Sequence, residues 1–169
     1  MKILLAIDDS PCSDAAVAEV ARRPWPAQSE VRLITVDPPL DPGLLWSGPA
    51  TVFDEFIQRQ RAEAAERLRK ATAALAHGAP ALRVTPALLE GRPKDAILAE
   101  AERWGAELVV VGSHGYGPVL RFFLGSVALY VALHAPCSVE IVRRRPGPPE
   151  SPPQDTHERD PGRASSVVP

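Results

Sequence analysis

Short apolar runs alternate with longer amphipathic stretches along this chain. Five runs contain neighbouring apolar residues with little polar alternation, which is typical of strands buried on both faces of a parallel sheet. These runs predict strands at residues 3–7, 31–36, 82–89, 108–111 and 139–142.

Four stretches between these runs have the residue spacing of amphipathic helices. They predict helices from Pro11 to about Arg23, from Val52 to His77, from Pro93 to Gly105, and over 126–134. Ser10 is a good N-cap for the first helix, because its hydroxyl can accept a hydrogen bond from a free backbone amide. Strands that alternate with helices indicate an α/β fold, a doubly wound five-stranded parallel sheet with helices on both faces.

The second of these helices carries its charges on the side away from the apolar stripe. Glu63 with Arg67, and Glu66 with Lys70, are spaced four residues apart, as in intrahelical ion pairs. We therefore expect both pairs to form on the solvent side of this helix.

Two segments lack the apolar pattern. Residues 37–50 are rich in proline and glycine and are long for a connection in a compact domain, which suggests a lid or an interface. Residues 144–169 are proline-rich and charged, and we interpret them as a disordered tail. Residues 1–143 then form one domain.

Composition gives no support for several classes of function. A net charge of −2 gives no electrostatic footprint for a nucleic acid or an anionic membrane. Cys12 and Cys137 are too few for a disulfide framework. No apolar stretch approaches the roughly 20 residues of a membrane helix, and the run 3–7 is too short for a signal peptide. We therefore expect a cytoplasmic protein.

Glycines gather where the fourth predicted strand ends. Gly112 and Gly115 follow that strand, and both can adopt positive φ and let the backbone approach a ligand closely. Gly125 and Ser126 open the last predicted helix, whose first amides point out of the helix towards any nearby anion. Successive free amides form a nest for an anion, so this set of residues predicts a phosphate site at the sheet edge.

Other motifs do not fit this loop. A P-loop needs GK[ST], whereas Gly125-Ser126 is preceded by Leu124. A dinucleotide fingerprint needs a third glycine where Leu120 stands, and it belongs after the first strand. A nucleophile elbow needs the spacing G-x-S-x-G, which is not present here. For any single glycine, a tight turn or a helix cap is the simpler explanation; only the set favours phosphate.

The spacing Gly112-x2-Gly115-x9-Gly125-Ser126 resembles the signature of the ATP-binding branch of the universal stress protein family. Residues 3–10 and 90–93 look like the same family, and the resemblance covers about 1–143. It implies a sheet order of 3-2-1-4-5 and a homodimer joined through the last strand. It also implies an ATP-binding regulatory protein of the stress response.

By the same resemblance, backbone amides would hold the phosphates of ATP and two strand ends would line the adenosine site. The phosphate residues are Gly112, Gly115, Gly125, Ser126 and the backbone of Val127, and the adenosine residues are Asp8 and Val36.

Several of these residues have a second interpretation. Asp8 is equally well explained as a strand-end carboxylate that accepts hydrogen bonds from nearby amides. His114 can donate to phosphate or simply lie in solvent. Asp9 replaces a glycine usual in the family and adds a negative charge near the phosphates, which weakens binding unless Mg²⁺ bridges the two. Glu140 puts a charge on the last strand that discourages pairing.

The loop has no dedicated catalytic base or carboxylate pair beside it. We therefore expect at most slow ATP hydrolysis or self-phosphorylation, not a dedicated enzyme. The alternative to nucleotide binding is a dimeric interaction module that no longer binds ATP, and Asp9 and Glu140 are the residues that motivate it.

Overall fold

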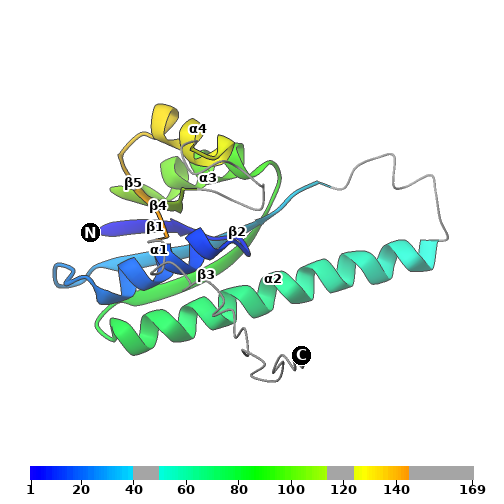
Figure 1. The fold of residues 1–169 in the computed structure, drawn as a ribbon, viewed down its shortest axis with the longest axis horizontal. Coiled ribbons are helices and arrows are strands. Elements are labelled where there is room, and N and C mark those ends of the chain that lie inside the picture. The colour runs from blue at the N-terminus through cyan, green and yellow to red at the C-terminus, as the bar shows by residue number, and fades with distance from the viewer. Residues whose placement is uncertain (40–49, 114–123, 145–169) are drawn as a thin grey trace, which may run out of the picture.

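Five parallel strands form one sheet in the order β3-β2-β1-β4-β5 (Figure 1). The structure, a computed structural model, describes residues 1–39, 50–113 and 124–144. The sheet order and the parallel direction of the strands confirm the prediction. Each strand begins and ends within one residue of its predicted first and last residue. The strands are β1 (Lys2–Ala6), β2 (Glu30–Asp37), β3 (Arg83–Glu90), β4 (Leu108–Gly112) and β5 (Ser138–Val142).

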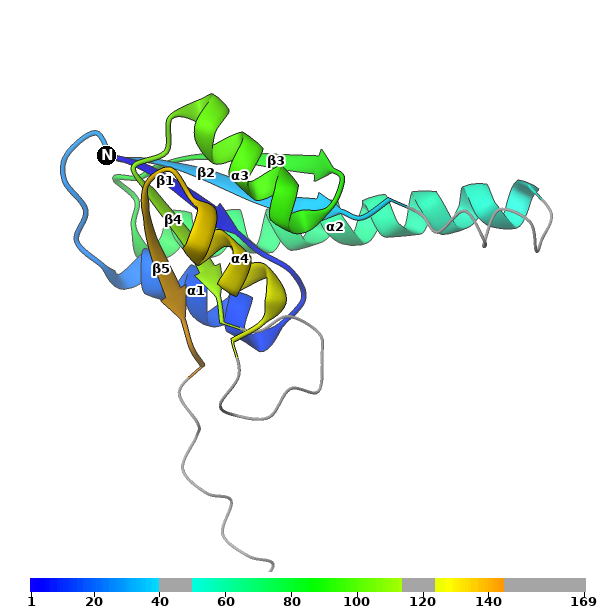
Figure 2. The same ribbon diagram turned by 90° about the horizontal axis from the view of Figure 1, so that it is seen from above.

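Helices cover both faces of this sheet, as predicted (Figure 2). Along β1 the side chains alternate between the two faces, so that Ile3 and Leu5 pack under one helix layer and Leu4 and Ala6 under the other. The first layer consists of α1 (Pro11–Arg22) and α2 (Ala50–Gly78), and the second of α3 (Pro93–Trp104) and α4 (Ser126–His134).

Local signals in the sequence account for where the helices begin and end. Ser10 caps α1, since its side chain accepts a hydrogen bond from the Ser13 amide at 3.2 Å. Gly105 ends α3 with φ of 69°, in the left-handed region that favours glycine.

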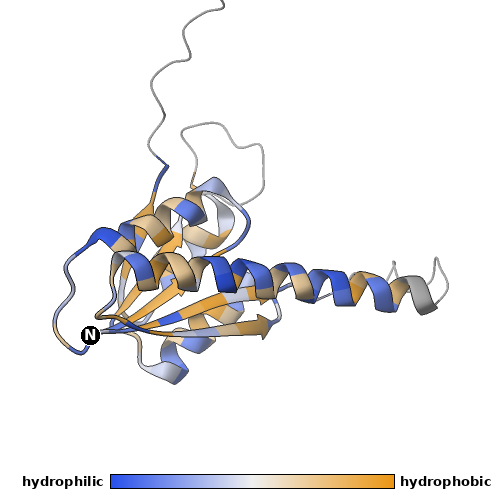
Figure 3. Cartoon of the chain, turned by 90° about the horizontal axis from the view of Figure 1, so that it is seen from below, coloured by the Kyte–Doolittle hydropathy of each residue, from blue (hydrophilic) through white to orange (hydrophobic). Residues whose placement is uncertain are grey.

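Helix α2 is longer than the sheet that it covers, and its N-terminal part extends beyond the sheet (Figures 1 and 3). Its buried residues, Ala64, Leu68, Ala71 and Leu75, all lie in the C-terminal half. Within the described residues, no helix is both long enough and apolar enough to span a membrane.

A buried carboxylate joins α3 to the sheet. Glu100 is 4% exposed and accepts a hydrogen bond from Nε of Arg32 on β2 at 2.9 Å. Arg103, which is mostly exposed, donates to both oxygens of the same carboxylate. Arg32 itself is 20% exposed and therefore depends on Glu100 for charge compensation.

Glu100→Gln should lower the free energy of unfolding by about 3 kcal/mol, the low end for breaking a buried ion pair, because Arg32 keeps some solvent. Urea denaturation monitored by circular dichroism measures this change. The control is Arg103→Gln, which removes the exposed partner and should cost less than about 1 kcal/mol. Equal losses for the two variants would contradict the central role of the Arg32–Glu100 pair.

Candidate functional site

The ends of β1, β2 and β4 meet at one edge of the sheet. Strand β1 lies between β2 and β4, and the chain leaves β1 towards β2 but leaves β4 towards β5. Such a reversal opens a crevice at the carboxyl ends of parallel strands, where ligands of α/β sheets bind. The sequence-predicted residues Asp8, Val36 and Gly112 all lie at this edge.

The exit of β4 and the start of α4 are joined by a short hydrogen bond. The amide of Gly125 donates to the carbonyl oxygen of Ser113 at 2.8 Å, and the amide of Ser113 donates to Val142 of β5 at 2.8 Å. Gly125 is the N-cap of α4 and makes no side-chain cap bond. The amides of Ser126 and Val127, in the first turn, therefore have no acceptor within the helix. The base of the glycine loop is thus closed, and helix amides that have no acceptor within α4 lie beside the β4 exit.

The expected positive φ of Gly112 is wrong, and packing requires a glycine at this position instead. Among the described glycines, Gly91 and Gly105 have a positive φ and Gly112 does not. A Cβ at Gly112 would lie 2.9 Å from the carbonyl carbon of Cys12 and 3.0 Å from the amide nitrogen of Ser13. The missing side chain therefore lets the N-terminus of α1 pack directly on the end of β4.

Gly112→Val should displace the first turn of α1, since the clash is with backbone atoms that cannot rotate away. We expect a loss of about 1–3 kcal/mol in unfolding free energy, as for other overpacked sites. Thermal and urea denaturation measure it. Gly125→Ala is the control, because its φ of −60° suits any residue. Wild-type stability of Gly112→Val would contradict this packing constraint.

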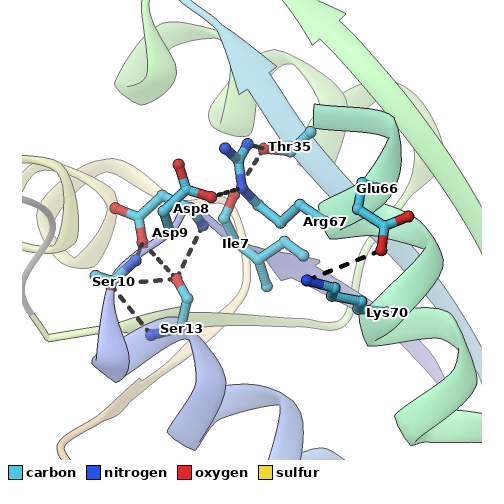
Figure 4. Close-up of polar contacts among 9 residues, drawn as sticks. All are labelled: Ile7, Asp8, Asp9, Ser10, Ser13, Thr35, Glu66, Arg67 and Lys70. Carbon is cyan, nitrogen blue, oxygen red and sulfur yellow. Dashed lines mark hydrogen bonds and ion pairs between the residues drawn. The ribbon is translucent and has the colours of Figure 1, made fainter. Parts of the chain in front are cut away.

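Asp8 is anchored by the first turn of α1 (Figure 4). Its Oδ1 accepts hydrogen bonds from the Ser10 amide at 3.0 Å and from the Ser13 hydroxyl at 2.7 Å. The same hydroxyl accepts a bond from the Asp8 amide at 2.9 Å. The strand-end interpretation of Asp8 is therefore confirmed for one carboxylate oxygen. This network fixes the position of the carboxylate at the end of β1.

Asp9 forms an ion pair with Arg67 of α2, which the sequence did not predict (Figure 4). Arg67 also donates to the Thr35 hydroxyl at 2.9 Å, and that hydroxyl donates to the carbonyl oxygen of Ile7 at 2.9 Å. The predicted pair of Arg67 with Glu63 is wrong, since Glu63 pairs with Arg59 instead. The second predicted pair, Glu66 with Lys70, is present at 3.8 Å.

Val36 and Val127 border the edge on the α3/α4 side of the sheet. Both are partly buried and pack against the core cluster of that layer, as Leu124 does. Ser126 is exposed at the start of α4. The remaining predicted residues, His114 and Gly115, lie outside the described residues.

A cleft of about 920 Å³ lies on the other side of the sheet, between α1 and α2. It shares Asp8 and Ser13 with the edge, but Val36, Gly112 and Ser126 do not line it. The cleft is therefore distinct from the site predicted from the glycine spacing.

Comparison with known proteins identifies the fold described above. Residues 1–143 match the sequence profile of the Universal stress protein family. The chain belongs to this family. A universal stress protein of Thermus aquaticus is 44% identical over 91 residues, which cover 54% of this chain and 64% of that relative. This universal stress protein thus spans somewhat less than two thirds of that relative's length.

Solved universal stress proteins share this architecture. UspA from Lactobacillus plantarum is 27% identical with a TM-score of 0.65, and the match covers 85% of this chain and 97% of UspA. Three others were solved with AMP (from Arabidopsis thaliana), with cAMP, and with dAMP (from Archaeoglobus fulgidus). In the same order, these three proteins are 19%, 23% and 24% identical to this chain, with TM-scores of 0.59, 0.57 and 0.58. The matches cover 84–86% of this chain and 92–97% of the solved chains.

Proposed function

We propose that this universal stress protein binds an adenine nucleotide at the β1/β4 edge and acts as an ATP-binding regulator of the stress response in the cytoplasm. The observation that supports this best is the bond between Gly125 and Ser113, which brings the exit of β4 next to the α4 amides that have no acceptor within the helix. The solved relatives with AMP, cAMP and dAMP support an adenine ligand.

In this proposal the amides of Ser126 and Val127 and the residues of the glycine loop donate to the phosphates. Each hydrogen bond to a charged phosphate contributes about 1.5–3 kcal/mol, and the positive end of the α4 dipole adds to it. The adenosine lies between Asp8 and Val36. The amide of Gly125 is already engaged by Ser113, so this glycine contributes a close backbone approach and not a donor.

Ser126→Pro tests the backbone amide without disturbing the helix. Proline is favoured at the first helical position, and Gly125 before it has φ −60° and ψ 149°, the extended conformation that a following proline requires. The substitution removes the amide and hydroxyl donors, so ATP affinity should fall by about 10- to 100-fold. Isothermal titration with ATP and Mg²⁺ measures the loss.

Ser126→Ala is the matched control, since it removes the hydroxyl and keeps the amide; it should retain more affinity than the proline variant. Circular dichroism and the melting temperature establish that both variants fold. Wild-type ATP affinity in folded Ser126→Pro would count against the proposed phosphate site.

The ion pair between Asp9 and Arg67 reduces the electrostatic repulsion that Asp9 would exert on a polyanion at this edge. Arg67→Gln leaves Asp9 unpaired, and ATP affinity should fall by up to about fivefold. Adding Asp9→Asn to the same chain should restore it. Titrations of the two single variants and the double variant at low salt measure this coupling. If Arg67→Gln leaves the affinity unchanged, Asp9 does not act on the bound phosphates.

The alternative is an interaction module that pairs through β5 without binding nucleotide, and one observation removes the charge objection to β5 as an interface. Both oxygens of Glu140 accept hydrogen bonds from Arg23 at 2.7 Å. These bonds, with those to Glu19, raise the pKa of Arg23. The charge of Glu140 is thus compensated within the chain, so it does not oppose a homodimer through β5. Absence of ATP binding in a folded dimer would favour this alternative.

A further inference from the structure

Helix α3 begins at the same edge of the sheet as α4. It follows β3 after two residues, so its first turn, like that of α4, lies at the carboxyl ends of the strands. The two helices lie side by side on one face of the sheet (Figure 2), and Ile97 of α3 and Val131 of α4 belong to the same core cluster. The positive ends of both helix dipoles therefore lie at the edge that carries the proposed phosphate site.

Lys94, in the first turn of α3, lies over an aromatic ring of α4. Its Nζ is 4.6 Å from the ring centroid of Tyr130, which is a cation–π contact. Tyr130 comes four residues after Ser126, so the two side chains lie on one face of α4. Helical side chains lean towards the N-terminus of their helix, so the Tyr130 ring lies over the turn that begins α4. The lysine ammonium is thus held beside the α4 amides that are proposed to bind phosphate.

No acidic side chain compensates this ammonium within residues 1–39, 50–113 and 124–144. Lys94 has no ion pair and no side-chain hydrogen bond there, and Arg92, the N-cap of α3, has none either. The first turn of α4 contains no acidic residue, and that of α3 contains one, Asp95. Positive charge from side chains and helix dipoles therefore gathers at this place, where it would stabilise a bound anion.

We propose that Lys94 interacts with the phosphates of the nucleotide and gives the site a preference for a nucleoside triphosphate over a monophosphate. This inference rests on the proposed function. Lys94 lies on the phosphate side of that site, because the ring that holds it belongs to α4, whereas the adenosine is proposed to lie at the ends of β1 and β2. Tyr130 acts as a positioning residue, which keeps the flexible lysine side chain in place.

The preference follows from Coulomb attraction. A triphosphate presents more oxygens and more negative charge to the ammonium than a monophosphate does, so it gains more from the same contact. The contact is only partly buried, since Lys94 is half-exposed at the surface, and salt should therefore weaken it.

Lys94→Met removes the charge and keeps an unbranched side chain on the Tyr130 ring. ATP affinity should fall by about tenfold, as for the loss of one hydrogen bond to a charged group, and AMP affinity by less than about threefold. Lys94→Arg keeps the charge and should retain most of the preference. Isothermal titrations with ATP and with AMP at one Mg²⁺ concentration measure these affinities. ATP binding to Lys94→Met should also depend less on salt than binding to the wild type.

Lys2→Met is the control for loss of a lysine charge. Lys2 also lies over a ring, with its Nζ 5.4 Å from the centroid of Trp104, but it stands at the start of β1, at the opposite edge of the sheet. This variant should leave the affinities for ATP and AMP unchanged. Circular dichroism and the melting temperature establish that all variants fold.

The positioning role of Tyr130 has its own test. Tyr130→Leu removes the ring and should lower ATP affinity by about two- to fivefold, whereas Tyr130→Phe keeps the ring and should retain most of the affinity. Equal ATP affinities of these two variants would overturn the positioning role.

Failure of this inference is distinguishable from failure of the proposed function. If Ser126→Pro weakens ATP binding but Lys94→Met does not, the phosphate site stands and the role of Lys94 is overturned. Equal losses of ATP and AMP affinity in Lys94→Met would overturn the preference for a triphosphate. A wild-type chain that binds neither nucleotide would contradict the proposed function, and this inference with it.

Discussion

The direct packing of α1 on the end of β4 is the constraint on which the carboxyl edge depends. Because Gly112 has no side chain, the Cys12 and Ser13 backbone lies where a Cβ would be. The same turn of α1 presents the hydroxyl of Ser13 and the amide of Ser10 to Asp8. One close backbone contact between β4 and α1 thus sets the position of the carboxylate at the end of β1.

The closed base of the glycine loop follows from the same edge. Ser113 is held by Val142 of β5 through its amide and holds Gly125 through its carbonyl oxygen. Backbone hydrogen bonds thus tie the start of α4 to β4 and β5. If the amides at the start of this helix bind an anion as proposed, their fixed position lowers the ordering cost of binding it.

Hydrophobic patterning was sufficient to predict the strands, helices and sheet direction, because buried runs and amphipathic stretches follow directly from which faces are covered. The sheet order came from the family resemblance, since apolar patterns do not say which strands are neighbours. The role of Gly112 was not predictable, because the sequence does not show that Cys12 lies beside it. Arg67 was predicted to pair within its own helix, but an acceptor 58 residues away holds it instead.

The charge balance at this edge bears on the proposal that a polyanion binds beside two adjacent aspartates. Asp8 is hydrogen-bonded through one oxygen, so the dipoles of an amide and a hydroxyl stabilise its negative charge. Asp9 is paired with Arg67, whose position is fixed in turn by Thr35 and the carbonyl oxygen of Ile7. Only the part of the Asp8 and Asp9 charge that these partners do not compensate would repel a phosphate, and solvent screens that part. In the proposed site the α4 amides would act on the phosphates at short range and in fixed directions, where a hydrogen bond to a charged group is strong.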